Sequence, residues 1–250
     1  MNAPAPQAAA DELWNCLNRM GRDDGARVER ILWQFRGLVA RKPCDFDARS
    51  GIARALLMLG RKEEAIPHVE ALWGMRHGRG FTELLCLGFV FLNYGNILHA
   101  LAVYDDLLDR PEARCDEILR NHMTELAFRA GDLTHWDRAE QVIGKANPGE
   151  QRWRALLSAN GLEEAFHHHQ AMAEAIIGPH ASYFHGNVMT DGDGETIAYL
   201  EYFTDLDEDA RFELEGAFSE RLDSGDLMRV ADCVTVCVRG PYANRLEAAA

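Results

Sequence analysis

Residues 53–72 read ARALLMLGRKEEAIPHVEAL. Apolar residues recur at helical spacing on both sides of Gly60, which indicates two short amphipathic helices joined by a glycine turn. The small residues Ala53 and Ala65 stand where the two helices of such a hairpin would press together. The segment therefore predicts an α-helical hairpin.

The same pattern recurs along the chain at a nearly fixed distance. Similar stretches begin at residues 89 and 125. The turn glycines are 35, 35 and 36 residues apart: Gly25, Gly60, Gly95 and Gly131. A period of this size predicts an array of helical hairpins.

The region from residue 11 to residue 178 resembles tetratricopeptide repeats. The second unit places small, large, large, glycine, small and large residues as that family does, at Ala53, Leu56, Leu57, Gly60, Ala65 and Leu72. The third unit fills the same roles with Gly88, Phe91, Gly95, Ala100, Tyr104 and Leu107. The first unit departs from the pattern at Arg30 and the fourth at Trp136, and the fifth is shortened. The resemblance implies a mainly α fold, a right-handed α-α superhelix with about five hairpins, whose concave groove binds a peptide or a partner protein.

In such repeats the first helix of each unit lines the concave groove. The register places ten residues there: Asn15, Arg19, Arg22, Ser50, Arg54, Leu85, Phe89, Asn121, Glu125 and Phe128. The three arginines would form a basic opening, and Leu85 and Phe89 an apolar floor. We expect this groove to accept a peptide with an acidic end and hydrophobic anchors. The alternative is that the arginines are solvated or pair with neighbouring acids.

After Pro179 the hydrophobic pattern changes from helical spacing to alternation. Residues 182–189 and 196–203 are β-rich runs joined by Asp191-Gly192-Asp193-Gly194, a strong hairpin signal. A helix at about 207–222 and a strand within 230–238 follow. We therefore predict a small acidic α/β domain of order β-β-α-β over residues 179–242. Its thin core would lean on the repeats or on a second copy.

The last predicted strand also suggests an oligomeric state. Residues 234–238 carry no proline or charge, the usual devices that blunt an exposed strand edge. We therefore expect this edge to pair with a second copy, which would give a homodimer through the C-terminal domain. The remaining segments, 1–10 and 243–250, are predicted to be a disordered lead-in and a tail.

Composition limits the class of protein. The chain has 250 residues, of which 47% are hydrophobic and 26% charged, and these are globular values. It contains no apolar run of the ~20 residues needed to span a membrane. The N-terminus does not resemble a secretory signal, and the six cysteines are scattered, so we expect a cytoplasmic protein with reduced thiols. We expect no cofactor and identify no catalytic residue.

The net charge of −14 is unevenly placed. Residues 187–232 contain fourteen Asp or Glu and three Arg, a local balance of −11. This argues against direct binding to nucleic acid, because phosphate contacts are made mainly by Lys and Arg. It leaves open that the C-terminal domain is an acidic decoy, which would occupy the basic surface of a nucleic-acid-binding protein.

A further alternative is a metal-binding protein or an enzyme with a site where the fifth unit meets the first C-terminal strand. His167, His168 and His169 are consecutive, and helix geometry turns them about 100° apart, so they cannot converge on one metal. A site would need His180, His185 or Glu163 as additional ligands. Protein binding without catalysis remains the main hypothesis.

Overall fold

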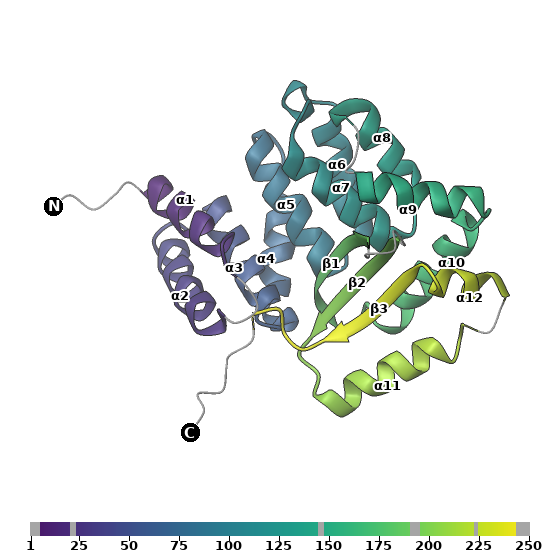
Figure 1. The fold of residues 1–250 in the computed structure, drawn as a ribbon. Helices are drawn as coiled ribbons and strands as arrows, with labels where there is room; N and C mark the ends of the chain where they lie inside the picture. The colour runs from purple at the N-terminus through teal and green to yellow at the C-terminus, as the bar shows by residue number, and fades with distance from the viewer. Residues whose placement is uncertain (1–5, 21–23, 145–147, 191–195, 223–224, 244–250) are drawn as a thin grey trace.

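The computed structural model describes residues 6–20, 24–144, 148–190, 196–222 and 225–243. The fold is mainly helical, with a three-stranded sheet near its C-terminal end (Figure 1). In the described ranges ten α-helices precede the sheet: α1 Pro6–Leu17, α2 Gly25–Arg41, α3 Phe46–Met58, α4 Lys62–Met75, α5 Phe81–Tyr94, α6 Ile97–Leu108, α7 Glu117–Ala130, α8 Thr134–Ile143, α9 Pro148–Ala159 and α10 Glu163–Ile176. A short 3-10 helix, Pro111–Ala113, lies between α6 and α7.

The turns within the helical pairs use the glycines expected from the sequence. Gly60, Gly95 and Gly131 have φ values of 78°, 90° and 64°, a backbone region that glycine enters without a steric penalty. Gly161 takes the same role between α9 and α10, with φ of 65°. Three of the four predicted turn glycines are therefore confirmed.

The first unit has a different register from the one predicted. Gly25 is the first residue of α2 and not a turn residue. The second helices begin at residues 25, 62, 97 and 134, so the first spacing is 37 residues. In this register the buried Val28 takes the place of Ala65 as fourth residue of its helix, and Arg30 is exposed.

Small residues lie where helices cross, as the sequence predicted. Ala53, Ala65 and Ala100 are fully buried. A side chain added at Gly88 would bring its Cβ within 2.5 Å of the ring of Tyr104. These positions allow neighbouring helices to approach closely, so larger residues there would overpack the core.

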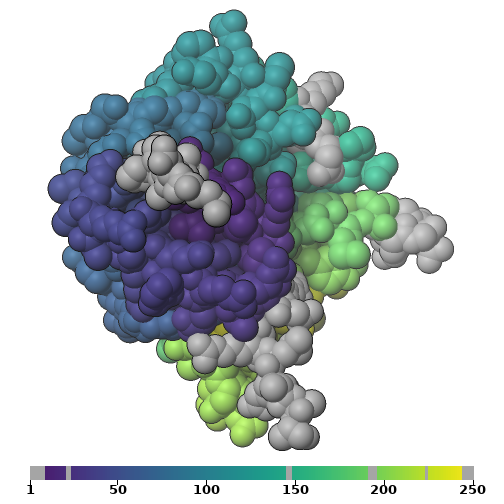
Figure 2. Space-filling model, turned by 90° about the vertical axis from the view of Figure 1, so that its left-hand side faces the viewer, coloured from purple at the N-terminus to yellow at the C-terminus, as the bar shows by residue number. Residues whose placement is uncertain are grey.

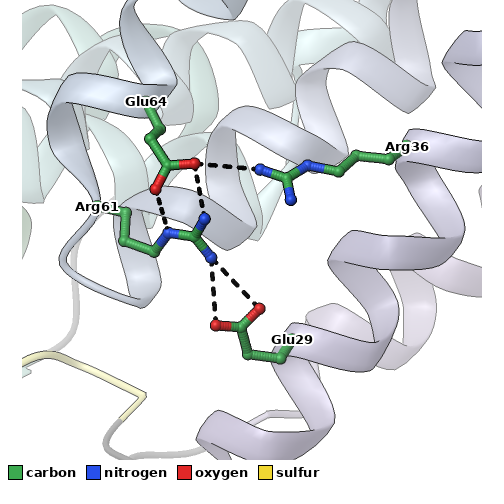
Figure 3. Close-up of polar contacts among 4 residues, drawn as sticks. All are labelled: Glu29, Arg36, Arg61 and Glu64. Carbon is green, nitrogen blue, oxygen red and sulfur yellow. Dashed lines mark hydrogen bonds and ion pairs between the residues drawn. The ribbon is translucent and has the colours of Figure 1, made fainter.

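Charged residues connect the first two helical pairs on the outside of the core. Arg61 contacts Glu64 through Nε and Nη2, at 2.5 and 2.6 Å, and Glu29 of α2 through Nη1, at 3.2 Å (Figure 3). Arg36 of α2 also donates to Glu64, at 3.2 Å. The carboxylate of Glu64 thus receives two arginines, which lower its pKa.

The sheet has the strand order β1-β2-β3. β1 (Ala181–Thr190) pairs antiparallel with β2 (Thr196–Thr204), and β3 (Val234–Arg239) runs parallel to β2. Two helices, α11 (Glu208–Ser219) and α12 (Gly225–Ala231), connect β2 to β3. The predicted β-β-α-β order is therefore right in outline, but the connection contains a second helix that the sequence reading missed.

The two faces of the sheet have different environments. One face is buried against the helices: Phe184, Leu200, Tyr202 and Val234 share a core with Phe128, Trp153, Phe166 and Phe218. The other face is solvated only in part: it carries the exposed Asn187 and Met189, but its Tyr183 and Phe203 are buried and share a core with Phe89 of α5. The first face is therefore the more fully buried of the two.

This buried face joins the two predicted domains. Ile177 of the helical region and Ala181 of β1 belong to one core, so the packing continues across the predicted boundary at residue 178. The C-terminal sheet packs against the helices, which is one of the two arrangements expected from its thin core.

The outer edge of β3 is partly covered by the chain itself. The helix α11 packs along β3, and Glu215 accepts a hydrogen bond from the backbone N–H of Val238 at 2.7 Å (Figure 1). This contact weakens the reason for expecting a homodimer, because that expectation assumed an open edge.

The two ends of the chain differ in part from what the sequence predicted. Residues 6–10 form the first turns of α1, so the predicted lead-in is helical from Pro6 onward. Ala243 donates a backbone hydrogen bond to Met58 at 2.8 Å. Residues 1–5, the turn at 191–194 and the tail from 244 lie outside the described residues.

The helices α1 and α2 form the end of the molecule that faces the viewer in Figure 2. A groove of about 470 Å³ between them is lined by Leu13, Trp33 and Leu38, among others. Trp33 is 75% exposed.

Candidate functional site

The helical face predicted to bind a partner is occupied by the chain's own first strand. β1 packs against α5 and α7. The backbone N–H of Phe184 donates to the side-chain oxygen of Asn93 at 3.0 Å, and the amide of Asn93 donates in turn to the carbonyl of Phe89 at 2.9 Å. At Gly186 an added Cβ would lie 2.7 Å from the ring of Phe128. The strand is therefore fitted closely to this face.

Four of the predicted groove residues do not lie at the surface. Ser50 and Phe128 are fully buried, and Leu85 and Phe89 are 7% and 8% exposed. The ring of Phe89 contacts that of Tyr183 edge-on, at 5.9 Å between centroids. Leu85 and Phe89, predicted to form an apolar floor, are thus buried, and β1 contacts Phe89 directly, so these side chains do not offer a surface to a partner in this structure.

Two predicted residues lie at the margin of β1. Glu125 of α7 contacts Nδ1 of His185 at 2.8 Å, with the carboxylate 13% and the imidazole 45% exposed. Arg54 of α3 lies 5.3 Å from the ring centroid of Trp14 and 4.6 Å from that of Phe89. These contacts connect α7 to the strand and α3 to both α1 and α5.

The remaining predicted residues are at the surface. Asn15, Arg19 and Asn121 are exposed, and Arg22 lies outside the described residues. Asn18, which the sequence reading did not select, accepts a hydrogen bond from Nη1 of Arg54. We use the name "rim" for the solvent-accessible residues of the predicted groove together with Asn18 and His185: Asn15, Asn18, Arg19, Arg54, Asn121 and His185.

Arg54 is the most constrained member of the rim. Its guanidinium is held between two aromatic rings and bound to Asn18, yet its buried Nε has no hydrogen-bond partner within the part of the chain that the structure describes. Placement over aromatic faces stabilises a cation electrostatically. The arrangement therefore presents a fixed, partly buried positive charge at the surface of an acidic protein.

The groups next to Arg54 are neutral. Burial, with a smaller contribution from Arg54, lowers the pKa of His122 to about 3. Burial also raises the pKa of Tyr183 far above its ordinary value, against the opposing effect of Arg54. Because neither group ionises near neutral pH, Arg54 supplies the charge at this part of the rim.

The histidine run does not form a site. His167 lies with Nδ1 3.3 Å from the carbonyl of Gly131, and His168 is exposed. His169 is buried, contacts the side chain of Gln170 at 2.9 Å and packs against Phe218. The three side chains have separate surroundings. His185, considered as a further ligand, contacts Glu125 of α7 instead.

Within the ranges that the structure describes, no three or more His, Cys, Asp or Glu side chains lie close enough together to hold a metal ion. The metal-binding hypothesis therefore gains no support from the geometry of these residues.

The sequence pattern indicated part of the arrangement around β1. Tyr183, His185 and Asn187 alternate along the first β-rich run and therefore share one face of the strand. Nothing in this pattern indicates that the strand would lie along the helical face. The contact between His185 and Glu125 spans 60 residues and could not be read from local spacing.

Comparison with family models, with curated proteins and with solved structures gives no match. Within the described ranges, no helix combines the length and apolar character needed to cross a membrane.

Proposed function

We propose that the chain is a protein-binding module built on a right-handed superhelix of tetratricopeptide-like hairpins. Its partner contacts the rim around β1 rather than the apolar floor beneath that strand. The observation that supports this most directly is Arg54, a partly exposed guanidinium held between Trp14 and Phe89.

A carboxylate is the chemical group best suited to this position. Guanidinium binds carboxylate in a planar, often bidentate geometry, and such charge-assisted hydrogen bonds are about twice as strong as neutral ones. A partner peptide would place an Asp, Glu or terminal carboxylate at Arg54. The exposed Arg19 adds a second positive charge from α1.

The rest of the rim is suited to polar contacts along a peptide. Asn15, Asn18 and Asn121 carry amides that can both donate and accept hydrogen bonds. The imidazole of His185 is held through Nδ1 by Glu125 and is partly exposed beside the strand. The rim thus combines one anchored cation with adaptable amides, a combination found in peptide-binding surfaces.

The test begins with affinity capture from the source cell with the full chain as bait, followed by mass spectrometry. The affinity of a recovered partner is then measured for Arg19→Glu and Arg54→Gln. We expect both changes to weaken binding about tenfold or more, equivalent to a loss of about 1.4 kcal/mol.

Arg30→Glu is the matched control, because Arg30 is an exposed arginine of α2 outside the rim. It changes the net charge as much as Arg19→Glu and should leave the affinity unchanged. Thermal unfolding of each variant separates lost binding from lost structure. Equal affinities for the native chain, Arg19→Glu and Arg54→Gln would refute the rim as the partner site.

A second candidate function is the acidic decoy, and α11 is the element that favours it. The exposed side of this helix carries Glu208, Asp209 and Glu213 together with Phe212, which is 76% exposed. A basic protein surface with an apolar socket would complement it. Salt-sensitive binding that is lost in Phe212→Ser but kept in Arg54→Gln would favour this function over the rim.

A further inference from the structure

Lys62 is one of only three lysines in a chain with 26 basic residues. It is the first residue of α4, and its Nζ donates to the carbonyls of Gly178 and Pro179 at 3.2 and 3.1 Å. Those carbonyls follow the C-terminal end of α10. The lysine therefore ties the second helical pair to the junction between α10 and β1.

The amine lines a pocket of about 500 Å³. The walls include Tyr94, Ile97 and Leu98, and Glu174 lies at the same site. Nζ is 5.4 Å from the centroid of the Tyr94 ring. Leu98 is 79% exposed, so the pocket has an apolar wall that reaches the surface. The site thus combines a primary amine with room for a small molecule.

Burial disfavours the ammonium form of Lys62. Burial lowers its pKa to about 8, and the cationic Arg129 of α7 adds to this effect. Glu174 of α10 and the neighbouring Glu63 oppose it, without restoring the ordinary value of 10.5. At neutral pH the neutral amine is then a larger fraction of the side chain than in an ordinary lysine.

We propose that Lys62 is an acyl-acceptor site, at which a small acyl thioester enters the pocket and acylates Nζ. The nitrogen lone pair attacks the thioester carbonyl, the new N–C bond forms, the C–S bond breaks, and the leaving thiolate takes up the proton released by the amine. A neutral amine can keep its two N–H donors on the carbonyls of Gly178 and Pro179 while its lone pair reacts. The amide product carries no charge, which removes the repulsion with Arg129.

This inference is independent of the proposed partner binding and is tested without a partner. The folded full chain is incubated with the acetyl thioester of N-acetylcysteamine at several pH values. Peptide mass spectrometry then gives the acetylation rate of each lysine. Lys42 is the internal comparison, because its side chain is 62% exposed and it lies outside the pocket.

We expect Lys62 to react about tenfold faster than Lys42 at pH 7, since its larger neutral fraction outweighs its burial and lower basicity. The rate at Lys62 should level off above about pH 8. In the urea-unfolded chain the preference should disappear. A rate at Lys62 equal to or below that of Lys42 in the folded chain would overturn the proposal, as would a preference that survives unfolding.

A variant of the pocket gives a second readout. Leu98→Asp changes an exposed side chain, so the fold should tolerate it, and it places a carboxylate in the pocket wall. The added charge should favour the ammonium form of Lys62 and slow its acetylation at pH 7 at least threefold, while Lys42 is unaffected. Unchanged acetylation of Lys62 in this variant would argue that the pocket does not govern its reactivity.

Discussion

Replacing Arg129 with methionine would remove a fully buried cation from the meeting point of α5, α7, α10 and the sheet. The guanidinium donates from Nε to Glu174 at 2.8 Å, and from Nη1 to the carbonyls of Leu92 and Asn93. It also lies 5.3 Å from the ring centroid of Phe184 in β1. Methionine keeps most of the volume and supplies none of these hydrogen bonds.

The expected loss of stability is large for a single substitution. Removing one partner of a buried ion pair costs about 3–5 kcal/mol, because the other charge stays desolvated without compensation. Here Glu174 is left with its carboxylate 21% exposed, and two backbone carbonyls lose their donor. For a chain of this size each kcal/mol lowers the melting temperature by about 2–4 °C, so we expect a decrease of roughly 10 °C.

Thermal unfolding followed by circular dichroism measures this decrease. Arg138→Met is the control, since Arg138 is 39% exposed and pairs with Asp105 and Asp109 at the surface, where such pairs contribute about 1 kcal/mol or less. The double variant Arg129→Met/Glu174→Met should recover part of the loss, because no buried charge is left without a partner. A melting temperature for Arg129→Met within 2 °C of the native value would refute the reasoning.

Three further predictions concern packing, pH and association. Gly88→Val should lower the free energy of unfolding by about 1–3 kcal/mol in denaturant titrations, because its side chain would meet the ring of Tyr104. Burial lowers the pKa of His122, so below about pH 6.5 the unfolded chain takes up a proton that the folded chain does not, and the free energy of unfolding falls as the pH decreases from there. His122→Gln should flatten this decrease. An unchanged pH profile of stability in that variant would contradict the burial of His122. Glu215→Ala should increase self-association in light scattering, because it uncovers the backbone N–H of Val238 at the sheet edge. Equal molecular masses for the native protein and the variant would show that Glu215 does not protect this edge.

Local patterns predicted much of the helical region. The turn glycines at 60, 95 and 131 and the small residues at the helix crossings follow from spacing alone, since a tight turn and a close helix contact each restrict residue type at a fixed position. The first unit was misread because Gly25 has the right spacing but begins a helix. A glycine identifies a turn only when the neighbouring periodicity agrees with it.

The position of the sheet could not be read in the same way. Alternation identified both strands of the hairpin, and β1 and β2 pair as expected. What the sequence did not contain was the placement of β1 along α5 and α7, which depends on contacts such as Asn93 with Phe184, 91 residues apart. Phe89 and Phe128 both contact β1, and the sequence did not indicate that a strand would cover them.

Hydrogen exchange of the β1 backbone amides tests most directly whether the strand fills the helical face and leaves the rim as the partner site. We expect residues 181–188 to exchange as slowly as the buried turns of α5 and α7, with the Phe184 amide protected by Asn93. In Asn93→Ala, protection of that amide should fall. Fast exchange of the β1 amides in the native chain, with α5 and α7 still protected, would contradict the packing of β1 against these helices. It would indicate that the apolar residues of the predicted groove are accessible to a partner.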